Sequence, residues 1–164
     1  MTATLEESAL LDFLSERLAD YDLGALGPLD VLADRMIAAL PDIGAPWGPA
    51  IGPVYTSAGL QEWLGISRQA ISQHVRGRRI LRLTTADGVS VFPSFQFGAN
   101  GDRLPYLREV LDALAQGIDD PWTWAVWLNT PGSQGLTHAE NLRRGDPTAV
   151  LEQAREDAAN WSRP

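Results

Sequence analysis

The sequence predicts a mainly α-helical protein: a winged helix-turn-helix with a short β-hairpin, preceded by an acidic helical arm and followed by a small C-terminal helical bundle. Three observations predict this fold. Two helical patterns meet at a glycine near position 65, an alternating pattern follows around an Asp-Gly pair, and apolar residues at helical spacing recur beyond position 100. We divide the 164 residues into an arm with a linker (1–55), a helix-turn-helix with its hairpin (56–98) and a helical domain (99–164).

The arm is predicted to hold two helices, Leu5–Leu18 and Pro28–Leu40, each with apolar residues at helical spacing. Residues 41–55 contain four prolines and three glycines, which argue against regular structure. Trp47 and Ile51 in that stretch can still pack onto a core. The acidic helical pair could be an oligomerisation element, a partner-binding element or a cap on the rest of the chain.

The segment L-G-I-S-R-Q-A-I-S has the pattern of a helix-turn-helix. Thr56 can cap the first helix, Gly65 suits the left-handed backbone of the turn, and Ser67 can cap the second helix. Gln61 stands four residues before the turn glycine, where a small residue is usual, so Gly59 or a slight rotation of the first helix must provide the room. An ordinary helical hairpin is the alternative.

The second helix is expected to run to about Arg76 and to divide into two faces. Ala70, Ile71 and Val75 form its inward stripe. Arginine and glutamine can make paired hydrogen bonds with base edges, whereas serine and a helix N-terminus hold phosphates. The outward residues that we predict to contact DNA are Ser67, Arg68, Gln69, Ser72, Gln73 and Arg76.

Residues 79–85 and 89–92 alternate in polarity on either side of Asp87 and Gly88, which predicts a hairpin in the position of a wing. Nearby arginines should face the duplex and contact phosphates, which gives affinity and salt dependence without sequence selectivity. These residues are Arg76, Arg78, Arg79 and Arg82. The alternative is a solvated basic edge that protects the strand from aggregation.

The net charge of −8 is unevenly distributed. Residues 1–55 hold nine acids and two arginines (−7), residues 56–98 hold two acids and five arginines (+3), and residues 99–164 hold ten acids and six arginines (−4). The basic segment therefore coincides with the helix-turn-helix pattern, and this agreement favours a nucleic-acid partner.

Several classes of function find no support in the sequence. The absence of cysteine excludes disulfides, Cys-ligated zinc and thiol nucleophiles. His74 and His138 lack a second ligand at metal-binding spacing, and we find no nucleophile–base pair or phosphate-binding glycine loop. We therefore expect neither an enzyme nor a cofactor or metal. No apolar run reaches the ~20 residues of a membrane span, and the N-terminus is acidic, so we expect a cytoplasmic protein without a membrane partner.

The C-terminal segment is predicted to form helices over 104–114, 121–128, 138–143 and 147–160. Trp124 and Trp127 share one helical face, whereas Trp122 points elsewhere and either tucks under a neighbouring helix or is exposed for a partner. Trp161 and Arg163 belong to a polar tail, which is either a partner-binding element or a frayed end.

The string R-R-I-L-R-L…G-V-S-V-F-P-S-F-Q-F, followed by W-A-V-W-L-N-T-P and by L-x-x-A-E-N-L-R-R-G-D-P-x-A-V-L, resembles the Xre–MbcA–ParS class of antitoxins over about residues 56–158. The resemblance implies a DNA-binding unit, a C-terminal toxin-binding domain and a RES-type toxin that consumes NAD. It places Trp127–Pro131 and Leu142–Val150 in the toxin-binding domain. With the tryptophans and the tail described above, the candidate toxin contacts are Trp122, Trp127, Thr130, Arg143, Arg144, Trp161 and Arg163.

We therefore predict an antitoxin of a type II toxin–antitoxin system, which neutralises the toxin of an adjacent gene and represses the shared promoter. It would act as a homodimer or in a larger hetero-oligomer, because operators usually mirror a two-fold axis. One alternative is a stand-alone winged helix-turn-helix regulator whose C-terminal bundle only dimerises. Another is a DNA-organising or adaptor protein that binds through the acidic arm. An adjacent toxin gene and a stable hetero-complex would distinguish the first function from the second.

Overall fold

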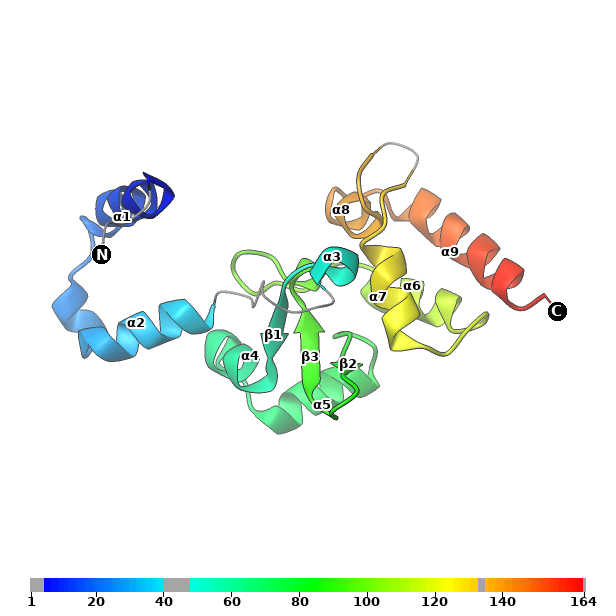
Figure 1. Ribbon diagram of the computed structural model, residues 1–164, viewed down its shortest axis with the longest axis horizontal. Helices are drawn as coiled ribbons and strands as arrows, with labels where there is room; N and C mark the ends of the chain where they lie inside the picture. Colours follow the sequence, from blue (N-terminus) through cyan, green and yellow to red (C-terminus); the bar gives the residue numbers. More distant parts are fainter. Residues whose placement is uncertain (1–4, 40–47, 133–134, 164) are drawn as a thin grey trace. The chain divides into compact units, whose positions relative to one another are not determined.

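The computed structural model describes residues 5–39, 48–132 and 135–163. The chain forms two compact units, residues 1–37 and residues 38–164, and each is described by itself. The fold is mainly helical with one small antiparallel sheet (Figure 1), as the sequence predicted. Residues 41–47 of the stretch predicted to be irregular (41–55), Trp47 among them, lie outside the described residues.

The first unit contains α1 (Leu5–Leu18) and α2 (Leu29–Ala38), joined by the short 3-10 helix η1 (Leu23–Leu26). Both predicted helices of the arm are confirmed. None of the described side chains between residues 7 and 37 is buried.

The second unit is built on a three-stranded sheet with the order β1-β3-β2, made of β1 (Val54–Thr56), β3 (Ser90–Pro93) and β2 (Leu83–Thr84). The predicted hairpin is confirmed as the β2–β3 pair, and Gly88 occupies its turn with a φ of 82°. Its first strand is shorter than the predicted 79–85, because only Leu83 and Thr84 pair with β3. The expectation of irregular structure up to residue 55 was wrong at its end. There α3 (Gly48–Ile51) is helical, and β1 pairs with β3. Pro53 lies just outside β1, where its carbonyl accepts a hydrogen bond from the Ser94 amide at 2.8 Å.

The sheet carries a hydrophobic cluster on each face because successive strand residues point to opposite sides. Val54 and Val91 join the cluster that contains the C-terminal helices, whereas Tyr55 and Phe92 join the cluster of the helix-turn-helix. The sheet is therefore the middle layer of this unit. The helix-turn-helix and the C-terminal helices cover its two faces.

The helix-turn-helix consists of α4 (Ser57–Leu64) and α5 (Arg68–Arg76). Its local signals act as predicted. The Thr56 hydroxyl accepts the Gly59 amide, the Ser67 hydroxyl accepts the Ala70 amide, both at 3.1 Å, and Gly65 is left-handed with a φ of 63°. The Gln61 amide donates to the Ser57 carbonyl at 2.9 Å, so this side chain folds back along its own helix instead of separating α4 from α5.

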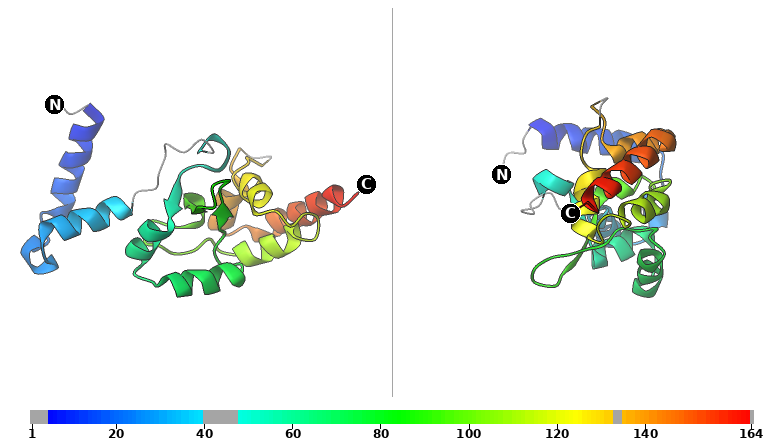
Figure 2. Two further views of the ribbon diagram at one scale, coloured as in Figure 1. Left: turned by 60° about the horizontal axis from the view of Figure 1, so that its bottom comes forward. Right: turned by 90° about the vertical axis from the view of Figure 1, so that its right-hand side faces the viewer.

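The C-terminal helices are α6 (Leu107–Leu114), α7 (Pro121–Leu128), α8 (His138–Arg143) and α9 (Pro147–Trp161), preceded by the 3-10 helix η2 (Ser94–Gln96). All four predicted helices are present with nearly the predicted bounds. Figure 2 shows α6 and α9 side by side. Their close approach passes Gly117, where a Cβ atom would lie 2.3 Å from the Ala158 carbonyl oxygen.

Candidate nucleic-acid interface

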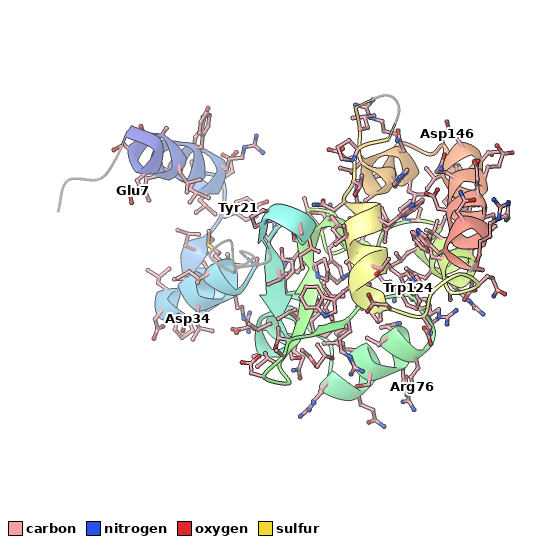
Figure 3. All side chains as sticks on the ribbon, turned by 45° about the vertical axis from the view of Figure 1, so that its right-hand side comes forward. Glu7, Tyr21, Asp34, Arg76, Trp124 and Asp146 are labelled. Atoms are coloured by element: carbon pink, nitrogen blue, oxygen red, sulfur yellow. The ribbon has the colours of Figure 1, made fainter. Side chains whose placement is uncertain are left out.

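The two faces of α5 differ in character as the sequence predicted. Ile71 is buried in the cluster shared with the sheet, and Val75 packs beside it. The opposite face carries the polar side chains, of which Ser72 is half-buried and the others are exposed: Ser67, Arg68, Gln69, Gln73 and Arg76. Figure 3 shows Arg76 projecting outward from the helix. This exposed row carries hydrogen-bonding groups of the types that can pair with base edges.

A small hollow of about 70 Å³ connects α5 to the hairpin. Arg68, Ser72 and Arg82 line it together with Ser57 and Ser90. The structure therefore brings together predicted DNA contacts from the second helix and from the hairpin, although residues 72 and 82 are ten positions apart. Beside the apolar side chains of Ile71, Val75 and Phe92, two guanidinium groups and three hydroxyls give this hollow hydrogen-bond donors for a ligand.

Charge pairing divides the arginines of residues 56–98 into two groups. Within the described part of the chain, Arg68, Arg76, Arg79 and Arg82 are exposed and form no ion pair with an acidic side chain. Arg78 instead pairs with Asp112 of α6 at 2.7 Å. The four exposed arginines keep their full charge for a partner, and this charge is what a polyanion requires.

Arg78 does not occupy the position that the sequence analysis assumed. Its guanidinium bridges Asp112 and the ring of Trp124, whose centroid lies 5.5 Å from the guanidinium carbon. Its backbone has a φ of 53°, an uncommon value for a residue other than glycine. These contacts correct the prediction for Arg78, because they give its side chain a role in joining the end of α5 to α6 and α7.

His74 lies on α5 next to Arg103, whose Nη1 is 2.8 Å from the His74 Nδ1 atom. Burial and the nearby charges of Arg103 and Arg79 lower the pKa of His74 below its ordinary value. The imidazole is therefore protonated less readily than an ordinary histidine and adds little positive charge to the interface. Sequence analysis did not single out Arg103, which comes from outside the helix-turn-helix.

Gln96 binds the main chain on both sides of the hairpin and is almost completely buried, with an exposure of 1%. Its Oε1 accepts the Leu81 amide at 2.6 Å, and its Nε2 donates to the carbonyls of Leu81 and Pro93 at 2.9 and 3.1 Å. The side-chain amide thus replaces a neighbouring strand for the residue that precedes Arg82. Its position between Phe95 and Phe97 was the one sequence signal that could have indicated a buried, positioned amide.

The candidate toxin contacts do not form one continuous group of exposed residues. Trp127 is buried, stacks on His138 with ring centroids 3.8 Å apart, and donates to Asp157 at 2.7 Å. Trp122 is half-buried and donates to the Thr84 carbonyl of β2 at 3.0 Å. Of the two alternatives for Trp122, the structure therefore shows packing against the neighbouring strand. Trp122 and Trp127 accordingly stabilise the bundle.

The remaining candidates are all exposed: Thr130, Arg143, Arg144, Trp161 and Arg163. Arg143 is held by Asp102 at 3.4 Å and by the Phe95 carbonyl at 3.1 Å. Trp161 ends α9, and Arg163 follows in the short C-terminal tail.

A polar pocket of about 350 Å³ lies among α8, α9 and the segment after α7, and is lined in part by Pro131, His138 and Asp157. Burial lowers the pKa of His138, and the nearby Asp157 carboxylate only partly offsets this effect. Within the described residues, no group of three or more His, Cys, Asp or Glu side chains could hold a metal ion. Among the described residues, no helix is long and apolar enough to cross a membrane.

No protein-family model matches the chain, and no curated protein sequence matches it. A solved structure, the NMR structure of Rv2175c, resembles the chain with a TM-score of 0.48 and 21% identity. The similarity covers 67% of this chain and 79% of that one.

Proposed function

We propose that this protein is a winged helix-turn-helix regulator that binds DNA in a sequence-selective manner through α5. The main supporting observation is the exposed polar face of a capped helix beside an arginine-bearing hairpin, with four exposed arginines that have no acidic partner in the described part. Arg68 and Gln69 would read bases from the N-terminal end of α5. Arg76, Arg79 and Arg82 would contact phosphates.

The test measures binding of the full-length protein to DNA from its own promoter by fluorescence anisotropy, at several salt concentrations. Replacing Arg68 or Gln69 with alanine should weaken binding to the cognate site by about 1–3 kcal/mol and leave binding to random DNA nearly unchanged. Arg82→Ala should weaken binding to both DNAs alike and lower the slope of log K against log salt by about one.

Arg108→Ala provides a matched control, because Arg108 is an exposed arginine of α6 that pairs with Asp112. It should change neither affinity nor selectivity. Equal losses on cognate and random DNA for all the variants would remove α5 from the reading role.

As a finer function, we propose that the protein is the antitoxin of a type II pair and neutralises a RES-type NAD-consuming toxin. Support comes from the sequence resemblance over residues 56–158 and from candidate contacts whose side chains are exposed, among them Thr130, Arg144, Trp161 and Arg163. The DNA-binding surface would then serve autoregulation of the operon.

The adjacent reading frame should arrest growth when expressed alone, and this protein should restore growth. An Arg144→Glu, Trp161→Ala double variant should lose the rescue, whereas Arg68→Ala should retain it, because toxin neutralisation does not require base reading. A harmless neighbouring frame would rule out the antitoxin function and leave the proposal of DNA binding intact.

A further inference from the structure

The arm formed by α1, η1 and α2 exposes an unusual amount of apolar surface. Its large apolar side chains with exposures between 37% and 65% are Leu10, Leu11, Phe13, Tyr21, Leu26, Leu29, Val31, Met36 and Ile37. Fourteen large hydrophobic side chains are exposed in the described part of the chain, and nine of them belong to the arm. Isolated helices of this length are marginal in water, so an arm of this kind needs a partner surface.

The apolar residues of each helix are grouped. In α1, helical spacing brings Leu10, Leu11, Phe13 and Leu14 to one side and places Asp12 and Glu16 on the other, whereas Glu7 lies on the apolar side one turn before Leu10. In α2, Leu29, Leu32, Met36 and Ile37 follow the spacing i, i+3, i+7 and i+8, and the acids lie outside this stripe. Each helix therefore offers an apolar face with a rim of carboxylates.

The size of this surface reaches the lower end of what a stable dimer requires. Six of the nine exposed side chains lie on the two helix faces, and at roughly 100 Å² each they amount to about 600 Å² per copy; these are Leu10, Leu11, Phe13, Leu29, Met36 and Ile37. Two copies would therefore bury about 1,200 Å² in total, the lower limit of a standard interface.

Charge decides which partner fits best. Residues 5–38 hold eight acids and two arginines, a net charge of −6. An anionic membrane surface would repel this arm. The basic face of α5 is polar and offers no apolar cover for leucines. The arm of a second copy presents the same apolar faces, and its carboxylates would remain in water at the rim, where salt screens their repulsion.

We propose that the arms of two copies of this chain pair through their apolar faces and make the protein a dimer. The pairing does not depend on DNA and would bring together the two reading heads that a two-fold operator requires. Because like-charged carboxylates oppose the contact, added salt should strengthen the dimer. Salt should act in the opposite direction on DNA binding, since counterion release weakens the latter.

The experiment is sedimentation equilibrium of the full-length chain without DNA, from about 1 to about 200 µM and at low and high NaCl. The wild type should dimerise, and its Kd should fall several-fold between about 50 and about 500 mM NaCl. A Leu11→Gln, Ile37→Gln double variant keeps the charge and a good helix former at both positions. It should raise the Kd at least about tenfold, a change of about 1.4 kcal/mol.

Ile118→Gln is the matched control, because Ile118 is an exposed isoleucine outside the arm, and it should leave the Kd unchanged. Far-UV circular dichroism and thermal unfolding establish that each variant is folded. A monomer throughout the concentration range, or a double variant that associates like the wild type, would overturn the proposal. So would a dimer that weakens with salt, because ion pairs would then hold it together.

Discussion

Replacing Gln96 with alanine tests whether its three buried hydrogen bonds hold the chain next to the hairpin in place. The change removes the acceptor of the Leu81 amide. It also removes the donor to the carbonyls of Leu81 and Pro93. Leu81 is 3% exposed, so water cannot easily replace the lost partner. A buried main-chain group left unpaired costs about 1–3 kcal/mol. The two orphaned groups of Leu81 alone therefore predict a loss of about 2–6 kcal/mol in the free energy of unfolding.

Urea denaturation followed by tryptophan fluorescence measures this loss, and amide hydrogen exchange reports on Leu81 itself. Gln116→Ala is the control, because the Gln116 side chain is exposed and makes only a 3.5 Å contact within its own turn. It should change stability by less than about 0.5 kcal/mol. A similar small change for Gln96→Ala, with Leu81 still protected from exchange, would refute the reasoning that this amide holds the strand.

Two further substitutions test the bundle. Gly117→Ala should destabilise the protein by about 1–3 kcal/mol in urea denaturation, because the added methyl group meets the main chain of Ala158; an unchanged midpoint would mean that α6 and α9 can separate at no cost. Asp120→Ala removes the N-cap of α7 and should cost about 1 kcal/mol near neutral pH. The hydrogen bond from the Thr123 hydroxyl is the main cause that holds the pKa of Asp120 below its ordinary value. The difference in the free energy of unfolding between wild type and variant should therefore be complete at pH values above the ordinary pKa of aspartate, and it should vanish as the pH falls through the lowered pKa. A difference that persists in acid would contradict this assignment.

The sequence was sufficient for the caps and turns that depend on a few neighbouring residues. The caps at Thr56 and Ser67, the left-handed turn at Gly65 and the Asp120–Pro121 start of α7 all satisfy their hydrogen bonds or φ values locally. Such signals need no distant partner, and so they are readable in one chain. The same holds for the division of α5 into an apolar and a polar face, which follows from helical periodicity.

Only the tertiary structure decided how these elements combine. The strand Val54–Thr56 is three residues long and follows a proline-rich stretch, so it has no periodic signature, and it exists because β3 supplies its hydrogen bonds. Arg78 and Gln96 likewise received their roles from residues 34 and 15 positions away. By itself the sequence determined the longer helices and which face of α5 is polar, but it did not indicate the short helix α3. The three-dimensional packing decided which arginines stay exposed, because burial and ion pairing depend on neighbours that sequence spacing does not specify.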